Sequence, residues 1–327
     1  MRAGVLALAL LALFVAGCGE EQSDGRAAPA ASEFPAPEGA TLAELQKRAG
    51  PSDLVVVPVG LTYEEGDRYG FVLSTAARKE IANADVALYF AAGEGPAQGP
   101  YPARTESLQA SPQFQSQSTG EDPETSKVLY VVDDPPFGRD GEWEVMAMIR
   151  AKDGSFDAAM APGIVVGYYP SRIHGFPVIA ENPIAVGEPA PRVHTPTIGD
   201  VASAKELDTR EPPDRMHEDD LADVLGRKPA IVVFATPAHC QTWACGPVLD
   251  ATEEASARFG DDVSFIHSEI YKGNDPNAGI RPQVLAFRLH SDTWLFAIDE
   301  DGVVQERLEG AWGPAAVEAA AEELLTK

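Results

Sequence analysis

The chain has 327 residues and a formal net charge of −26. This length is enough for two domains of ordinary size. The negative charge argues against nucleic acid and anionic lipid surfaces as partners, because both repel an acidic protein. Three cysteines occur, Cys18, Cys240 and Cys245. Their placement is the strongest functional signal in the sequence.

The N-terminus has the pattern of an export signal. Arg2 is followed by the apolar run 5–16, which is too short for a bilayer span of about 20 residues. The run ends in Val15-Ala16-Gly17-Cys18, which resembles the lipobox of bacterial lipoproteins. That resemblance implies a signal peptide over 1–17 and an acylated Cys18. It also implies a protein held at the bacterial membrane through this lipid anchor only, facing outside the cytoplasm, where disulfides persist.

Residues 18–51 are rich in Ala, Pro, Glu and Ser and lack apolar periodicity. Such a composition is typical of a flexible tether. A short helix is expected over Leu42–Arg48, at the end of this stretch.

Strand signals recur over 52–185. Short runs rich in Val, Tyr and Phe, bounded by Gly, Pro or Asp, predict a β-sandwich. The hairpin 127–150 resembles the closing hairpin of immunoglobulin-like extracytoplasmic domains. A helix is expected only over 76–81, and 93–126 is expected to be a long polar loop. The expected strands are 54–59, 69–74, 86–91, 128–133, 142–150 and 164–169.

Residues 186–327 follow another pattern. After a Pro-rich connector over 186–228, strand and helix signals alternate, which predicts an α/β sheet with mixed strand directions. A turn at 299–302 joins the last two strands. The expected strands are 230–234, 263–270, 294–298 and 303–308, and the expected helices are 246–259, 283–289 and 314–325.

Four segments of this region, VGEPAP, IVVFATPAHC, WLFAIDEDG and the last helix, resemble the thioredoxin superfamily. The resemblance implies an α/β thioredoxin-like fold for this C-terminal region, so the expected chain has two domains, an N-terminal all-β immunoglobulin-like sandwich and this C-terminal domain. It places Cys240 where a strand ends and a helix begins, where the helix dipole stabilises a thiolate. Cys240 is therefore the expected nucleophile and Cys245 its resolving partner, with His239 adding positive charge at low pH.

The cysteine spacing constrains the local backbone. Five positions on a regular helix span about 7.5 Å and turn through about 140°, whereas bonded cysteines have Cα atoms about 4.4 to 6.8 Å apart. Either Cys240 precedes the helix or the first turn unwinds on oxidation. In a second register, Cys245-Gly246-Pro247 resembles the start of the thioredoxin motif, but the distance from Phe234 favours Cys240.

TPAHCQTWACG also resembles the Q-type peroxiredoxins, which implies a thiol peroxidase with Cys240 attacking peroxide. Thr236 lies four residues before Cys240, where that family has it three before. Thr293 stands where the thioredoxin group has a cis-proline. We expect Asp292 and Thr293 to lie near the cysteines.

FRLHSDTWLFAIDEDG resembles a segment of copper-delivering thioredoxin-fold proteins. This resemblance implies copper bound by Cys240, Cys245 and His290, whereas thiol–disulfide exchange and peroxidase chemistry require no cofactor. His217 and His267 have no spacing that marks them as ligands.

A non-catalytic binding module with a structural disulfide is a further possibility, in which Trp243 and Trp294 form a docking platform or belong to the core. The leading prediction is thiol–disulfide exchange with protein thiols or disulfides outside the cytoplasm, through Cys240 and Cys245.

Overall fold

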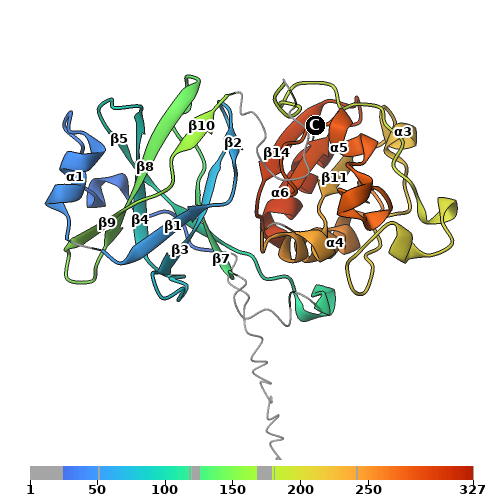
Figure 1. Cartoon of the computed structure of the whole chain (residues 1–327), viewed down its shortest axis with the longest axis horizontal. Helices are drawn as coiled ribbons and strands as arrows, with labels where there is room; N and C mark the ends of the chain where they lie inside the picture. Colours follow the sequence, from blue (N-terminus) through green and yellow to red (C-terminus); the bar gives the residue numbers. More distant parts are fainter. Residues whose placement is uncertain are drawn as a thin grey trace, which may run out of the picture.

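The computed structural model describes residues 25–50, 52–117, 119, 126–167, 179, 181–240 and 242–326. Over these ranges the chain forms three β-sheets and a few helices (Figure 1). The first two sheets and α1 lie in one half of the molecule, and the third sheet with α4 and α6 lies in the other.

The first sheet has the order β1-β3-β7-β6, and all its neighbours are antiparallel. Its strands are β1 (Leu54–Pro58), β3 (Tyr69–Thr75), β7 (Val128–Val132) and β6 (Arg104–Ser107).

The second sheet has the order β2-β10-β8-β4-β5, with β9 also paired to β8. Only the β2–β10 pair is parallel among the described strands of this sheet. A buried aromatic cluster that includes Phe71, Phe90, Tyr130 and Trp143 draws on strands of both sheets. The strands are β2 (Thr62–Tyr63), β10 (Ile164–Val166), β8 (Gly141–Arg150), β4 (Asp85–Ala92), β5 (Gln98–Pro102) and β9 (Phe156–Met160).

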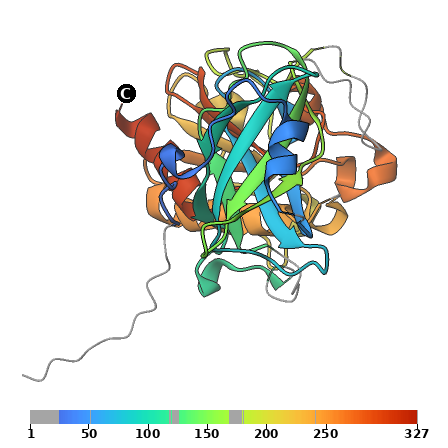
Figure 2. The ribbon, with the colours of Figure 1, turned by 90° about the vertical axis from the view of Figure 1, so that its left-hand side faces the viewer.

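The segment 25–50 packs on the second sheet and is not the expected tether. It contains η1 (Ala31–Glu33) and α1 (Leu42–Arg48), whose capping box joins Thr41 and Glu44. Leu45 is fully buried in a cluster with Tyr89 and Met146. In Figure 2, α1 lies in front of the strands of this half. A few well-placed apolar residues therefore order a segment whose average composition is polar.

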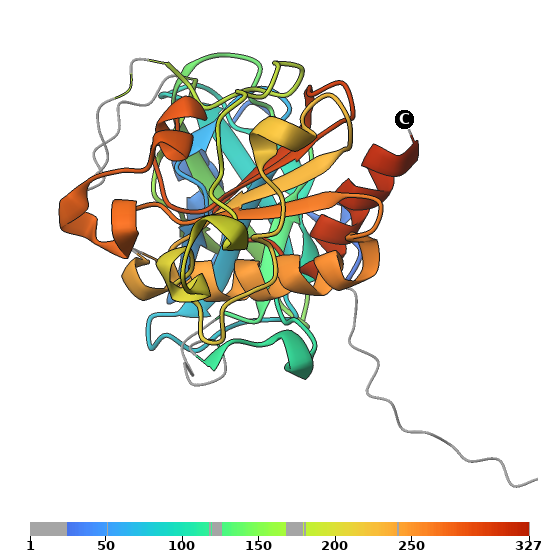
Figure 3. The same ribbon diagram turned by 90° about the vertical axis from the view of Figure 1, so that its right-hand side faces the viewer.

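The third sheet has the order β12-β11-β13-β14. β11 is parallel to β12 and antiparallel to β13, and β13 is antiparallel to β14. Figure 3 shows the two longest helices of this half, α4 in orange and α6 in dark red. The strands are β11 (Ala230–Phe234), β12 (Ser264–Ser268), β13 (Trp294–Ile298) and β14 (Val304–Glu309), and the helices are α3 (Leu221–Val224), α4 (Cys245–Phe259), α5 (Pro282–Ala286) and α6 (Pro314–Thr326). The remaining short 3-10 helices are η2 (Pro112–Phe114), η3 (Ile198–Asp200), η4 (Ala204–Glu206), η5 (Pro237–His239), η6 (Lys272–Asn274) and η7 (Pro276–Ala278).

One hydrophobic core joins the two halves. It combines Val72 and Leu129 of the first sheet with Leu249 of α4, Leu295 of β13 and Trp312 before α6. All five side chains are buried. The helices thus bury apolar surface against the first sheet as well as against the third.

The expected fold class is wrong. The sequence predicts an immunoglobulin-like sandwich followed by an α/β thioredoxin-like fold, whereas the part of the chain that the structure describes is a β-rich fold with three sheets and only 24% helix. The expected helix 283–289 is the five-residue α5, which ends just before Arg288 at a positive φ of 59°. Residues 76–81 form a turn and an isolated bridge from Glu80 to Ser74 instead of a helix.

Polar contacts also join the halves around β14. Arg307 forms a bidentate salt bridge with Asp67, in which Nε donates to Oδ1 at 3.0 Å and Nη2 donates to Oδ2 at 2.7 Å. The Glu309 carboxylate accepts hydrogen bonds from the Thr62 amide at 2.9 Å and from the Ser291 hydroxyl at 2.6 Å. Burial raises the pKa of Glu309 to about 7, outweighing these hydrogen bonds, which lower it.

Gly313 tests the close packing of the halves. A Cβ atom there would lie 1.8 Å from the Ser107 carbonyl oxygen. We expect Gly313→Ala to lower the free energy of unfolding by about 1–3 kcal/mol, because the backbone has to move apart. Gly138→Ala is the matched control, since a Cβ there meets nothing within 4 Å. Urea unfolding of both variants measures the difference, and equal stability of the two would contradict the packing.

Glu309 predicts a pH dependence of stability. The folded state keeps this proton up to about pH 7, while an unfolded glutamate releases it near its ordinary value of 4.5. The folded state therefore binds more protons in this window, and its stability falls as pH rises through it. We expect Glu309→Gln to flatten this decline in urea unfolding midpoints. An unchanged slope in the variant would show that Glu309 does not titrate in this window.

Candidate functional site

Cys240 and Cys245 form a disulfide, with a Cα–Cα distance of 6.0 Å. Cys240 follows η5, and Cys245 is the first residue of α4. In this disulfide-bonded state the nucleophile candidate therefore precedes the helix, as the spacing requires of a bonded pair.

The two sulfur atoms have different environments. Cys245 is fully buried in the shared core, whereas Cys240 is partly exposed at its edge. The Cys245 amide lies 3.3 Å from the Cys240 Sγ and points toward it. This backbone N–H group at the start of a 15-residue helix provides the positive potential that stabilises a thiolate.

A buried carboxyl lies next to the inner sulfur. Oδ2 of Asp292 is 3.8 Å from Sγ of Cys245, and Asp292 is only 2% exposed. Ligand-type atoms of Cys240, Cys245 and Asp292 all lie within 4.8 Å of one another.

The structure does not group His290 with that set. It is buried, and burial lowers its pKa. Thr293, also buried, accepts a hydrogen bond from the Gly310 amide through its carbonyl, 2.9 Å away. Thr293 thus ties the loop before β13 to the residue that follows β14.

The other candidate residues differ in their surroundings. Nε2 of His239 lies 2.9 Å from the Asn274 carbonyl oxygen. Thr236 is fully buried, and its hydroxyl makes no hydrogen bond with any described residue. Trp243 packs partly buried against the shared core, and Pro247 is buried in the first turn of α4. Trp294 belongs to the core, stacked on Phe296.

Cys18 and the export signal 1–17 lie outside the described residues. Within the described ranges, no helix has both the length and the apolar character that crossing a bilayer requires.

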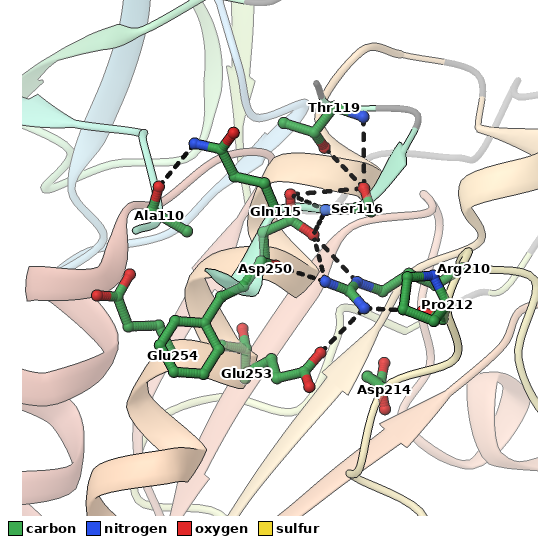
Figure 4. Close-up of polar contacts among 12 residues, drawn as sticks. Ala110, Gln115, Ser116, Thr119, Arg210, Pro212, Asp214, Asp250, Glu253 and Glu254 are labelled. Carbon is green, nitrogen blue, oxygen red and sulfur yellow. Dashed lines mark hydrogen bonds and ion pairs between the residues drawn. The ribbon is translucent and has the colours of Figure 1, made fainter. Parts of the chain in front are cut away.

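A buried ion-pair network, which the sequence did not indicate, holds the middle of α4 (Figure 4). The Arg210 guanidinium lies 2.9 Å from a carboxylate oxygen of Asp250 and 3.0 Å from one of Glu253. The Ser116 amide donates to both oxygens of Asp250, at 3.0 Å each. Burial raises the pKa of both Asp250 and Glu253. The expectation of a loop over 93–126 is therefore wrong in part, because this stretch contains β5 and β6, and its segment around Ser116 docks on α4.

A second buried cluster lies beside this network and consists of Asp208, Asp214, His217 and His267. His267 lies on the edge strand β12, whereas the other three come from the expected connector. Burial lowers the pKa of His267, but the Asp214 carboxylate outweighs it and raises the value to about 10. The pKa of Asp214 is lowered by His267 despite the opposing effect of burial. Neither histidine was expected to be a ligand, since no local spacing marks them.

No family model matches the chain, and no curated protein matches it. Among solved structures, a ZirS C-terminal domain aligns at 8% sequence identity, covering 50% of this chain and 98% of that one, with a TM-score of 0.18. A similarity this weak supports no conclusion about fold or function.

The difference in exposure predicts a difference in reactivity. After reduction, we expect Cys240 to be alkylated more than about tenfold faster than Cys245, because only its sulfur is accessible and next to a helix N-terminus. Timed alkylation of the native protein, followed by mass spectrometry of the two peptides, measures both rates. Faster labelling of Cys245 would contradict the observed burial.

Proposed function

We propose that this protein carries out thiol–disulfide exchange with protein clients through Cys240 and Cys245. The supporting observation is the asymmetric pair, with a partly exposed Cys240 before a helix and a buried Cys245 within it. In such a pair one sulfur is open to a client while the other is protected from it.

The chemistry follows from this asymmetry. A client thiolate attacks the Cys240 sulfur, the bond to Cys245 breaks, and its electron pair stays on the Cys245 sulfur. A second client thiolate then attacks the mixed disulfide, which leaves an oxidised client and a reduced Cys240. The same steps in reverse reduce a client disulfide, with two electrons passing from the protein.

Asp292 is the group that exchanges a proton with the buried sulfur. Its Oδ2 lies 3.8 Å from the Cys245 Sγ. As an acid it protonates the Cys245 thiolate when the disulfide opens, and as a carboxylate it removes that proton when the disulfide closes. A buried thiol has little access to water, so a nearby carboxyl is the proton donor and acceptor at hand.

We also propose that the protein acts outside the cytoplasm, anchored through an acylated Cys18. The apolar run and the Cys that follows it support this location. An oxidising compartment is where a disulfide can form and persist.

Exchange by the full-length protein in detergent tests the proposal, with a disulfide-bonded peptide as client. We expect Cys240→Ser to reduce the rate to the uncatalysed background, and Cys245→Ser to accumulate a mixed disulfide between Cys240 and the client. Cys18→Ser is the matched control and keeps the wild-type rate in solution. Wild-type exchange by Cys240→Ser would refute the proposal.

The reduction potential distinguishes exchange from a purely structural disulfide. A value above about −250 mV is typical of exchange-competent pairs, and one below about −300 mV is typical of structural disulfides. Thiol alkylation in glutathione or dithiothreitol buffers measures it, and a value in the lower range would favour a binding module.

A further inference from the structure

We propose that Asp208, Asp214, His217 and His267 bind one divalent transition-metal ion, for which Zn²⁺ is the best fit. The site is separate from the disulfide and does not depend on the function proposed for it.

The four side chains converge on one point in the interior. Nδ1 of His267 lies 2.9 Å from Asp214 and 3.8 Å from Asp208. Nε2 of His217 lies 3.3 Å from Asp214 and 3.6 Å from Asp208. Ligands placed tetrahedrally around Zn²⁺, with bonds of about 2.0–2.2 Å, are separated by about 3.3–3.6 Å. The observed distances bracket this range.

Three of these atoms are buried without a hydrogen bond to any described residue, namely Asp214 Oδ2, His217 Nε2 and His267 Nδ1. Each nevertheless lies within ion-pair distance of another member of the cluster. Buried polar atoms in proteins are normally hydrogen-bonded. His267 Nδ1 and Asp214 Oδ2 face each other as an ion pair, and a cation among the four side chains would satisfy all three of these atoms at once.

The surrounding groups hold the ligands in the orientation for binding. Nε2 of His267 lies 3.2 Å from the Ala235 carbonyl oxygen, so Nε2 keeps a proton, and Nδ1, which faces Asp214, is the atom that a metal would bind once its own proton leaves. Asp208 accepts hydrogen bonds from the Arg210 and Asp214 amides, at 2.7 Å each, and Asp214 accepts one from the Met216 amide at 2.9 Å. Contacts of this kind are typical of the groups that support metal ligands.

The charge of the region also favours a cation. The cluster holds two carboxylates beside two imidazoles, and all four side chains are at most 5% exposed. A divalent cation would take the place of the proton that His267 carries opposite Asp214. The nearest buried guanidinium, Arg210, is already paired with Asp250 and Glu253. A divalent ion neutralises the two carboxylates, whose uncompensated burial costs several kcal/mol per charge.

The ligand types select the metal. Two imidazole nitrogens and two carboxylate oxygens suit Zn²⁺, whereas Ca²⁺ and Mg²⁺ prefer all-oxygen sites. Four protein ligands in a closed site leave no open position for a substrate, so the metal has a structural role. It would fasten the segment 208–217 to the edge of β12, where the His267 amide also donates to the Met216 carbonyl at 2.8 Å.

Metal analysis of the full-length protein tests the site, with the disulfide kept oxidised so that no thiol can bind metal. We expect about one equivalent of zinc per chain in wild type and less than about a tenth in His217→Gln and His267→Gln. His194→Gln is the matched control, because His194 is an exposed histidine on the surface. The Cys240→Ser/Cys245→Ser double variant should also keep its metal.

A second measurement covers variants that fail to fold. Wild type treated with chelator should take up Co²⁺ with the visible absorption of a tetrahedral site, and Zn²⁺ should raise its Tm. Absence of uptake from micromolar Zn²⁺ or Co²⁺ would overturn the proposal. A full equivalent of metal retained in both histidine variants, or lost in the cysteine double variant, would overturn it as well.

Discussion

The ion pairs of Arg210 with Asp250 and Glu253 are the constraint on which the rest of the architecture depends. Ten of the fifteen residues of α4 are buried, and these two acidic side chains are among them. Buried carboxylates are tolerated only when a cation and hydrogen bonds compensate them. Arg210, itself 3% exposed, provides the cation, and the Ser116 amide adds hydrogen bonds. This compensation lets α4 pack against the third sheet, the first sheet and the segment around Ser116 at once.

Helix α4 links two sites with opposite exposure. Its first residue, Cys245, carries the inner half of a disulfide whose outer half reaches the surface. Asp250 and Glu253 in the middle of the helix form ion pairs with Arg210. The backbone amide of Arg210 in turn donates a hydrogen bond to Asp208 of the buried cluster. An accessible sulfur suits chemistry with a client, whereas ligand atoms sealed from solvent suit structural stabilisation. A rigid core beneath the disulfide would keep the Cys240 sulfur in one position relative to the helix N-terminus.

Local elements could be predicted from the sequence better than their assembly. The strands 230–234 and 294–298 have the expected limits, because continuous apolar runs between turn residues determine them. The fold class could not be predicted, because it depends on which apolar faces meet. Val72 and Leu129 are ordinary strand residues in the sequence, and nothing local indicates that they pack against Leu249 of a distant helix. Similarly, Leu45 orders a segment whose average composition is typical of a tether.

The disulfide and the buried Asp–His cluster also differ in how far the sequence could predict them. The cysteine pair was visible because its members are five residues apart and follow an apolar strand. The Asp–His cluster draws three residues from a Pro-rich connector and a fourth from β12, fifty positions after His217. One signal was present, since the titratable residues His267 and Glu269 lie within the strand run 263–270, which is buried throughout. Polar side chains inside such a run need partners, and those partners must come from whichever segment covers the edge of the strand. A charged residue in a predicted core strand therefore points to a distant polar segment, even where no motif does.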